Sequence, residues 1–478
     1  MRDNSDKNKT APTPPKAINW ITMALLTTVA VASIRGLPAM APYGLASILL
    51  YVIPAVVFLI PTALVSAELA SGWEGGVFGW VNAAYGGNAG MFAIWQQWVQ
   101  NVVWFPAQLA FFAAALAYIF DPGLANNGLF VGIVIIAVYW IANHLALRGV
   151  ETFSQVGSKG LIVGTLIPVL VLVVLAVVFI STGGKSYITG SEASFIPVWA
   201  GFASIVLIIS NFLSYAGMEM NAVHVTDMHN PEKTFPKAML LACILILLVF
   251  IPGTLAISVC LPASGINLTT GVLQAFDVMF SYVGIAWGTH VMAALIVIGI
   301  LASVVIWIPG PSKGLLLVGQ EGYLPPWFQK TNKNGMQENI LLVQGTAVTV
   351  LALFFAFIPS VQEAFWILSA MCVQLYLIMY VMMFLSAMRL RKTEPDKKRG
   401  FRVPAMGVVA SLGLIASVLA FVIGFFQPAG ANMNPLVYAG ILLAGILLLG
   451  TWPMFISRYK KSGWDLRQKD KTESEQGT

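Results

Sequence analysis

The chain has 478 residues, of which 58% are hydrophobic and only 10% are charged, and it carries a formal net charge of +6. A soluble domain usually contains about a quarter charged residues, so a chain this long and this poor in charge cannot cover itself with a water-compatible surface. The composition, with a mean hydropathy of +0.82, therefore excludes a soluble globular protein. Lipid offers no hydrogen-bond partners to backbone polar groups, so the composition predicts an all-α integral membrane protein.

Apolar stretches that are long enough to cross a membrane recur along the whole chain. They predict about twelve membrane-spanning helices, at residues 18–44, 46–70, 91–120, 127–147, 157–181, 196–223, 237–262, 282–310, 340–359, 361–388, 405–427 and 433–457. Together these helices form one transmembrane domain, residues 18–457, between polar tails at residues 1–17 and 458–478. The first tail lacks the pattern of a signal peptide, so we expect the first helix to be retained.

The distribution of Lys and Arg predicts the orientation of these helices. If the N-terminus is cytoplasmic, 23 of the 26 basic residues fall in cytoplasmic segments. Such a bias marks the cytoplasmic side of membrane proteins. We therefore expect a multi-pass protein of the cell (inner) membrane with both termini in the cytoplasm. Because topology explains the positive charge, we expect no nucleic-acid partner.

Two of the expected helices are interrupted, the first over residues 32–38 and the sixth over residues 214–219. They lie five helices apart, which places them at corresponding positions of a five-plus-five inverted repeat, residues 18–181 and 196–388, followed by two further helices. Paired interrupted helices indicate a substrate site near the membrane midplane. A proline kink and an isolated helix glycine are the alternative. The candidate site residues at these interruptions are Ala32, Ser33, Tyr215 and Gly217.

Three ionisable residues in or beside the apolar segments are functional candidates, because a charge inside a membrane is costly. The guanidinium of Arg35 could bind a substrate carboxylate in a bidentate pair, or it could pair with Glu219 or with helix carbonyls. Glu219 could take up a proton, since burial disfavours its charged form, and so act in gating; a structural hydrogen bond is the alternative. Lys159 could fill a cation site with its ammonium group, or it could extend to the membrane interface.

Polar and aromatic side chains mark the third, eighth and tenth expected helices. Gln97, Asn101 and Trp104 recur at helical spacing on one face of the third helix. Further candidates for the substrate site are Trp98, Ser303, Trp307, Tyr376 and Tyr380. Amides also join helices in lipid and aromatic rows often pack, so packing is the alternative role for this set.

The sequence contains no pattern for a metal, a cofactor or a nucleotide. Its three cysteines and four histidines are not at metal-ligand spacing. The phosphate-binding pattern GxxxxGK[ST] does not occur. We therefore expect a transporter rather than an enzyme, with no cofactor, driven by a gradient or by exchange.

Several motifs resemble those of a known family. Residues 214–219, Ser-Tyr-Ala-Gly-Met-Glu, and the loop 227–236 resemble the amino acid/polyamine/organocation transporters. Residues 72–81, 310–314 and 332–335 are similar to the bacterial glutamate/GABA antiporter branch. The resemblance covers nearly the whole membrane domain. It implies a LeuT-like fold with the substrate site between the first, third, sixth, eighth and tenth helices.

The resemblance also implies roles for individual residues. Glu219 matches the glutamate that follows the broken sixth helix, and Lys159 matches a lysine in the region of a lost sodium site of sodium-independent relatives. The residues that match aromatic positions around the site are Trp98, Trp307, Tyr376 and Tyr380. The implied function is an antiporter that exchanges an external amino acid for an internal amino acid or its decarboxylated amine. A proton-coupled amino acid symporter on the same fold is the alternative.

The chain departs from the glutamate/GABA branch at the site itself. Arg35 replaces an aromatic residue, Ser303 replaces an acidic one, and residues 31–33, Val-Ala-Ser, replace the usual glycine-rich break. The cavity should therefore be more positive, which favours a substrate with an extra anionic or acceptor group and disfavours cationic amino acids. The expected partners are a small amino acid or amine and the lipid bilayer, and the sequence leaves open whether the protein forms a homodimer.

Overall fold

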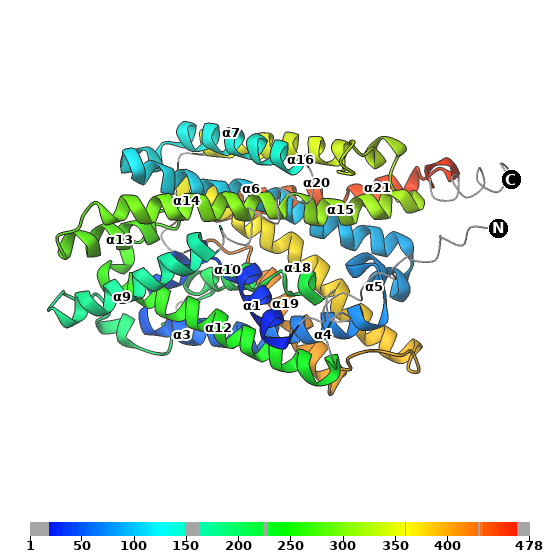
Figure 1. Cartoon of the computed structure of the whole chain (residues 1–478), viewed down its shortest axis with the longest axis horizontal. Helices are drawn as coiled ribbons and strands as arrows, with labels where there is room; N and C mark the ends of the chain where they lie inside the picture. The colour runs from blue at the N-terminus through cyan, green and yellow to red at the C-terminus, as the bar shows by residue number, and fades with distance from the viewer. Residues whose placement is uncertain are drawn as a thin grey trace, which may run out of the picture.

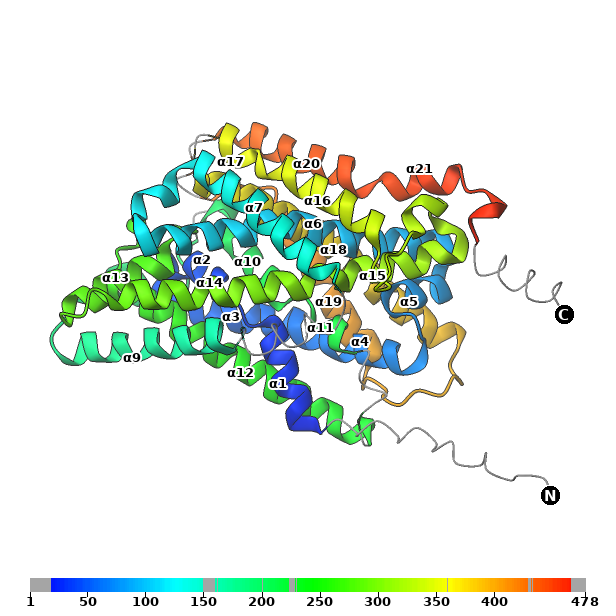
Figure 2. The same cartoon turned by 45° about the horizontal axis from the view of Figure 1, so that its top comes forward.

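The computed structural model describes residues 19–148, 160, 162–199, 201–222, 228, 230–358, 360–428, 431 and 433–465. Within these residues the secondary-structure elements are helices and helical turns, with no β-strand among them, and Thr331 and Gln337 form an isolated β-bridge. Most helices run along the long axis of the molecule, with α9 and α13 at one end and α5 and α21 at the other (Figures 1 and 2). The predicted all-α architecture is confirmed.

The principal helices are α1 (Trp20–Val31), α2 (Leu37–Met40), α3 (Ser47–Pro54), α4 (Ile60–Gly72), α5 (Gly76–Tyr85), α6 (Gly87–Phe120), α7 (Gly128–Ala146), α9 (Ile167–Ser181), α10 (Ile209–Tyr215), α11 (Met218–Ala222), α12 (Pro231–Cys260), α13 (Gly271–Tyr282), α14 (Gly288–Trp307), α15 (Pro309–Val318), α16 (Glu338–Ala352), α17 (Phe354–Phe357), α18 (Val361–Thr393), α19 (Met406–Ile423), α20 (Pro435–Gly450) and α21 (Trp452–Arg458). Short tighter or wider turns join some of them, among which η1 (Ile34–Gly36), η2 (Ala41–Ala46), η3 (Ala55–Leu59) and η5 (Ile162–Leu166) continue membrane segments.

Ten helical segments of the described chain are long and apolar enough to cross a membrane. They are Ile34–Gly72, Gly87–Phe120, Gly128–Ala146, Ile162–Ser181, Pro231–Cys260, Gly288–Tyr323, Glu338–Phe357, Val361–Thr393, Met406–Ile423 and Pro435–Arg458. The first and sixth expected helices do not appear as whole segments, because each is broken. The total of twelve and the domain limits at residues 18 and 457 stay predictions.

The break in the first segment lies where the sequence predicts it. Helix α1 ends at Val31, and Ala32 and Ser33 are extended, with ψ of 115° and 129°, before the chain turns again at Ile34. Extended residues between two helical pieces leave backbone N–H and C=O groups without helical partners. A second bend follows at Gly44, whose φ of 52° and ψ of −127° separate this segment from α3.

The break in the sixth segment is also confirmed. Helix α10 ends at Tyr215, Ala216 is extended with ψ of 150°, and α11 begins at Met218. Gly217 has φ of 105°, a conformation that side chains other than glycine rarely adopt. A Cβ atom on Gly36 would lie 2.7 Å from Ser214 Oγ, so the two breaks are in direct contact.

Three expected boundaries were wrong. Residues 201–208 of the expected sixth helix form short 3₁₀ turns, because Gly201, with φ of 87°, interrupts a regular helix. The eighth helix begins at Gly288 rather than at residue 282, since a turn containing Gly284 separates it from α13. The tenth helix continues to Thr393 rather than 388. The positive charges of Arg391 and Lys392 in its last turn stabilise this end, because they interact favourably with the negative end of the helix dipole.

Helices α6 and α18 form the centre of the molecule. They pack against each other, and α6 also packs against α14 and α5. Most of their residues are buried, whereas only 22% of the apolar window of the α20–α21 segment is buried. Buried amides and hydroxyls on these two central helices therefore face other helices or an internal cavity rather than lipid.

Candidate functional site

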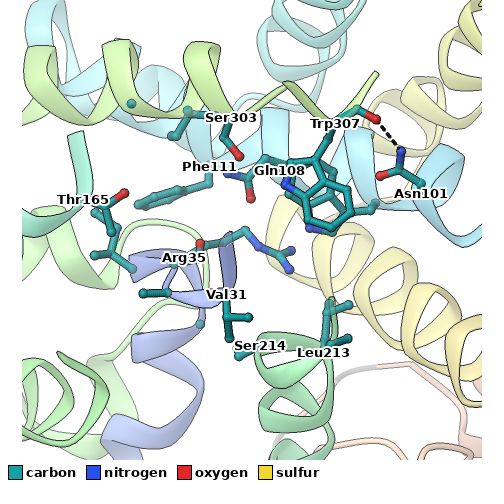
Figure 3. Close-up of a pocket in the computed structure, with 18 of the residues that line it drawn as sticks. Val31, Arg35, Asn101, Gln108, Phe111, Thr165, Leu213, Ser214, Ser303 and Trp307 are labelled. Carbon is teal, nitrogen blue, oxygen red and sulfur yellow. Dashed lines mark hydrogen bonds between the residues drawn. The ribbon is translucent and has the colours of Figure 1, made fainter. Parts of the chain in front are cut away.

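A cavity of about 80 Å³ lies between the two breaks (Figure 3). It is lined by the end of α1, the break at Ala32 and Ser33, and η1, together with α6, η5, α10, α14 and α18. Its lining residues are Val31, Ala32, Ser33, Ile34, Arg35, Gly36, Gln100, Asn101, Trp104, Gln108, Phe111, Gly164, Thr165, Leu213, Ser214, Ala216, Gly299, Ile300, Ser303, Trp307 and Tyr376. The cavity is lined by the first, third, sixth, eighth and tenth helices of the expected set, which are the five that the resemblance implies around the substrate site, and also by the fifth, which it does not.

Seven of the twelve residues predicted to bind substrate line this cavity. They are Ala32, Ser33, Arg35, Asn101, Ser303, Trp307 and Tyr376. Among them Ala32 and Ser33 present the unwound backbone of the first break, and Trp307 of α14 covers Gly217, where a Cβ would lie 3.3 Å from the indole. These seven residues thus form one surface, and their role in binding remains a proposal.

Arg35 is a buried cation, and Figure 3 shows its side chain pointing into the cavity. Its Nη1 donates to Ser369 Oγ at 3.3 Å, and its Cζ lies 5.4 Å from the centre of the Phe365 ring. Both partners lie on α18 and neither is an anion. Within the described part of the chain, no carboxylate lies within ion-pair distance of this guanidinium, so the alternative pairing with Glu219 is not what the structure contains.

Glu219 lies beside the cavity, in a buried network of hydrogen bonds. The hydroxyl groups of Tyr376 and Tyr380 donate to its two carboxylate oxygens, the second at 2.5 Å, and Gln97 Nε2 donates to Oε1 at 3.1 Å. The backbone N–H of Gly217 donates to the Tyr380 hydroxyl at 2.9 Å. This network joins α6 and α18 to the sixth-segment break, and the carboxylate acts only as an acceptor in it.

Gln97, Gly217 and Tyr380 were predicted to bind substrate, but they belong to this network and do not line the cavity. The spacing argument placed Gln97 correctly on the same helix face as Asn101. It could not show that Gln97 lies one turn away from the cavity, at the level of Glu219. Tyr376 alone belongs to both sets, because it lines the cavity and donates to Glu219.

Two further predicted residues point elsewhere. Trp98 Nε1 donates to Gln344 Oε1 of α16 at 2.8 Å, because a step of one residue turns the side chain away from the face that carries Gln97. The Tyr215 hydroxyl donates to the backbone oxygen of Tyr51 at 3.0 Å, and its ring stacks on Phe250. The structure therefore assigns Trp98 and Tyr215 to helix packing rather than to the cavity.

The sequence analysis missed part of the lining. Trp104, which was predicted to share a helix face with Gln97 and Asn101, lines the cavity, whereas the lining residues that were not selected as candidates include Gln100, Gln108, Phe111, Thr165 and Ser214. Gln108 and Phe111 continue the helical spacing of Gln97, Asn101 and Trp104, so extending that stripe by two turns would have found them. Gly164 and Gly299 allow η5 and α14 to touch, because a Cβ on Gly164 would lie 2.2 Å from Gly299 Cα. Nothing in the sequence pattern pairs these two glycines.

Lys159, which was predicted to fill a cation site, lies outside the described residues. In the part of the chain that the structure describes, no group of three His, Cys, Asp or Glu side chains is arranged to hold a metal ion.

Comparison with known proteins extends this description. A family model described as amino acid permease matches residues 18–448. An uncharacterized transporter of Legionella pneumophila is 34% identical over 93% of this chain and 97% of its own length. The glutamate/gamma-aminobutyrate antiporter of Lactococcus lactis is 28% identical, covering 94% of this chain and 92% of the relative. The cadaverine/lysine antiporter of Escherichia coli is 25% identical, covering 80% and 79%.

Proposed function

The chain belongs to the amino acid permease family, and we propose that it is an antiporter that exchanges an external amino acid for an internal amino acid or its decarboxylated amine. It is a multi-pass membrane transporter. The antiporter names of two relatives, from Lactococcus lactis and Escherichia coli, support exchange. We further propose that it works in the cell membrane with both termini in the cytoplasm, on the basis of the Lys and Arg distribution.

The proposal is supported mainly by the surroundings of the Arg35 guanidinium. Its guanidinium is buried beside the cavity, it makes one hydrogen bond to a neutral serine, and it has no carboxylate partner among the described residues. A buried cation without an anionic partner is costly. A substrate carboxylate would supply the missing charge and could use the planar fork of N–H groups. Arg35 is therefore the proposed receptor of the substrate carboxylate.

The chemistry of the lining supports a particular kind of exchange pair. None of the residues that line the cavity is Asp or Glu. A diamine such as cadaverine would bring positive charge next to Arg35 with no acid in the described lining to balance it, since Glu219 lies beside the cavity and already accepts hydrogen bonds from Tyr376, Tyr380 and Gln97. Both glutamate and γ-aminobutyrate, named for the Lactococcus lactis relative, carry a carboxylate. We therefore propose that both exchanged compounds carry a carboxylate, as in a glutamate/γ-aminobutyrate type of pair.

Exchange can be tested with the full-length protein in proteoliposomes. Vesicles preloaded with glutamate or γ-aminobutyrate should take up labelled glutamate much faster than empty vesicles, whereas vesicles preloaded with cadaverine should not. Equal uptake by empty vesicles under a proton gradient would identify the protein as a proton-coupled symporter instead. Strong stimulation by internal cadaverine would refute the requirement for a carboxylate.

A further inference from the structure

Three amide side chains of α6 face the cavity, and two of them are already used by the protein. Asn101 Nδ2 donates to the backbone oxygen of Trp307 at 2.9 Å. Gln100 Nε2 donates to the backbone oxygen of Gln97 at 3.1 Å, and its Oε1 accepts from the Cys372 thiol at 3.2 Å. These bonds hold α6 against α14 and α18, so neither amide is free to change partners without cost to the helix contacts.

Gln108 is the third amide, and it is different. Its side chain is only 4% exposed, and its Oε1 is buried with no hydrogen-bond partner. Among the described residues its Nε2 has no partner either. Figure 3 shows the amide pointing into the cavity that also receives Arg35. An unpaired buried amide is uncommon and needs an explanation.

The two groups with unused hydrogen-bonding capacity are complementary. Arg35 offers only donors, which suit a carboxylate. Gln108 offers an acceptor oxygen and a donor nitrogen, which suit a neutral polar group. The α-ammonium group of an amino acid has other acceptors available, namely the backbone carbonyls left unpaired where α1 and α10 end at the two breaks. Gln108 is thus left for the side chain of the substrate.

We propose that Gln108 is a specificity-determining residue, which selects amino acids whose side chain can hydrogen-bond to its amide, either by donating to Oε1 or, as a carboxylate does, by accepting from Nε2. A carboxamide fits best, because it can donate to Oε1 and accept from Nε2 at once. This inference rests on the proposed function insofar as the cavity holds an amino acid. It adds that substrates with apolar side chains are discriminated against, because they would leave the Gln108 amide buried and unpaired.

Binding of matched amino acid pairs to the purified full-length protein tests the inference. The pairs are glutamine with methionine, serine with alanine, and threonine with valine, and each pair differs mainly by a polar group. The wild-type protein should prefer the polar member of at least the glutamine/methionine pair. In Gln108→Leu this preference should fall by about tenfold or more, the value of one buried hydrogen bond.

Two further variants make the result specific. Gln100→Leu removes another amide from the same helix and the same cavity, but one that is already paired; it should lower thermal stability and leave the preference unchanged. Gln108→Glu keeps an acceptor oxygen, so it should retain the preference for glutamine over methionine and should weaken binding of glutamate. It also provides a measurable variant if Gln108→Leu does not fold.

The outcomes separate this inference from the proposed function. An unchanged glutamine/methionine ratio in Gln108→Leu, or no preference in any wild-type pair, would overturn the role of Gln108. Failure of preloaded vesicles to stimulate uptake would overturn exchange, while a ratio that depends on Gln108 would still stand.

Discussion

The hydroxyl group of Tyr380 donates to Glu219 Oε2 at 2.5 Å and accepts the backbone N–H of Gly217 at 2.9 Å. Tyr380 thereby links the tenth membrane helix to the break in the sixth and to α11, which follows the break. Tyr376, one helical turn earlier, also donates to Glu219 but accepts no backbone bond in the described structure. The two tyrosines therefore differ in what their hydroxyl groups stabilise.

This difference predicts unequal effects of removing each hydroxyl. Tyr380→Phe leaves the Gly217 N–H and one carboxylate oxygen without partners, whereas Tyr376→Phe removes a single bond. An unsatisfied buried group costs about 1–3 kcal/mol, so Tyr380→Phe should lower the unfolding temperature more than Tyr376→Phe. Thermal unfolding of the purified variants measures both. Equal unfolding temperatures would show that the Gly217 bond contributes nothing.

Glu219 itself is predicted to contribute to the pH dependence of transport. Glu219→Gln keeps the shape of the side chain and can still accept from Tyr376 or Tyr380, but it cannot gain or lose a proton. We expect the variant to fold and to lose part of the pH dependence of its exchange rate. Exchange rates of wild type and variant over a pH series in proteoliposomes measure this effect. Superimposable pH profiles would leave Glu219 with a structural role only.

The breaks and the polar helix faces could be predicted because they depend on local sequence. Ala32–Ser33 and Gly217 interrupt apolar runs, and the spacing of Gln97, Asn101 and Trp104 places them on one face of α6. Depth along a helix could not be predicted in the same way. Whether a residue on the correct face meets the cavity or the Glu219 network depends on the axial position of α6 relative to its neighbouring helices. That position is determined by contacts between residues far apart in the sequence.

The contact partners of individual side chains could not be predicted from the sequence either. Arg35 contacts Ser369, which is 334 positions away in the sequence, and neither residue type suggests the other. Trp98 was placed at the site by resemblance, yet its neighbour in space is Gln344, a residue that no motif marks. Such contacts follow from the packing of whole helices, which a single sequence does not encode in any local pattern.

A second buried charge cluster lies at the end of the molecule that carries α5. Glu68 Oε2 accepts the Val403 N–H at 2.6 Å and lies 3.1 Å from Arg391 Nη2, and Glu68 Oε1 lies 3.4 Å from Arg399 Nε. These contacts hold the segment between α18 and α19 against the end of α4. Desolvation lowers the pKa of Arg399, and the negative charge of Glu68 opposes that shift.

Removing the Glu68 charge should therefore destabilise the protein. Glu68→Gln removes the carboxylate that contacts both Arg391 and Arg399, which should cost about 3 kcal/mol or more. Glu338→Gln is a matched control, because the Glu338–Lys330 pair at 3.1 Å is exposed and such pairs contribute about 1 kcal/mol or less. Chemical or thermal unfolding of both variants gives the comparison. A loss of stability in Glu68→Gln no larger than in the control would contradict the prediction.

The last prediction concerns the charge and the shape of Arg35 as the proposed carboxylate receptor. Arg35→Lys keeps the positive charge but replaces the planar fork by a point charge, so it should weaken glutamate binding by about tenfold and leave the protein folded. Arg35→Ala should abolish binding of glutamate and γ-aminobutyrate. Ser369→Ala removes the one hydrogen bond that orients the guanidinium and should have a smaller effect than either. Binding isotherms and unfolding temperatures of the three variants distinguish loss of the receptor from loss of the fold. If Arg35→Ala binds both compounds with wild-type affinity, the guanidinium does not receive the substrate carboxylate and the unpaired charge needs another explanation.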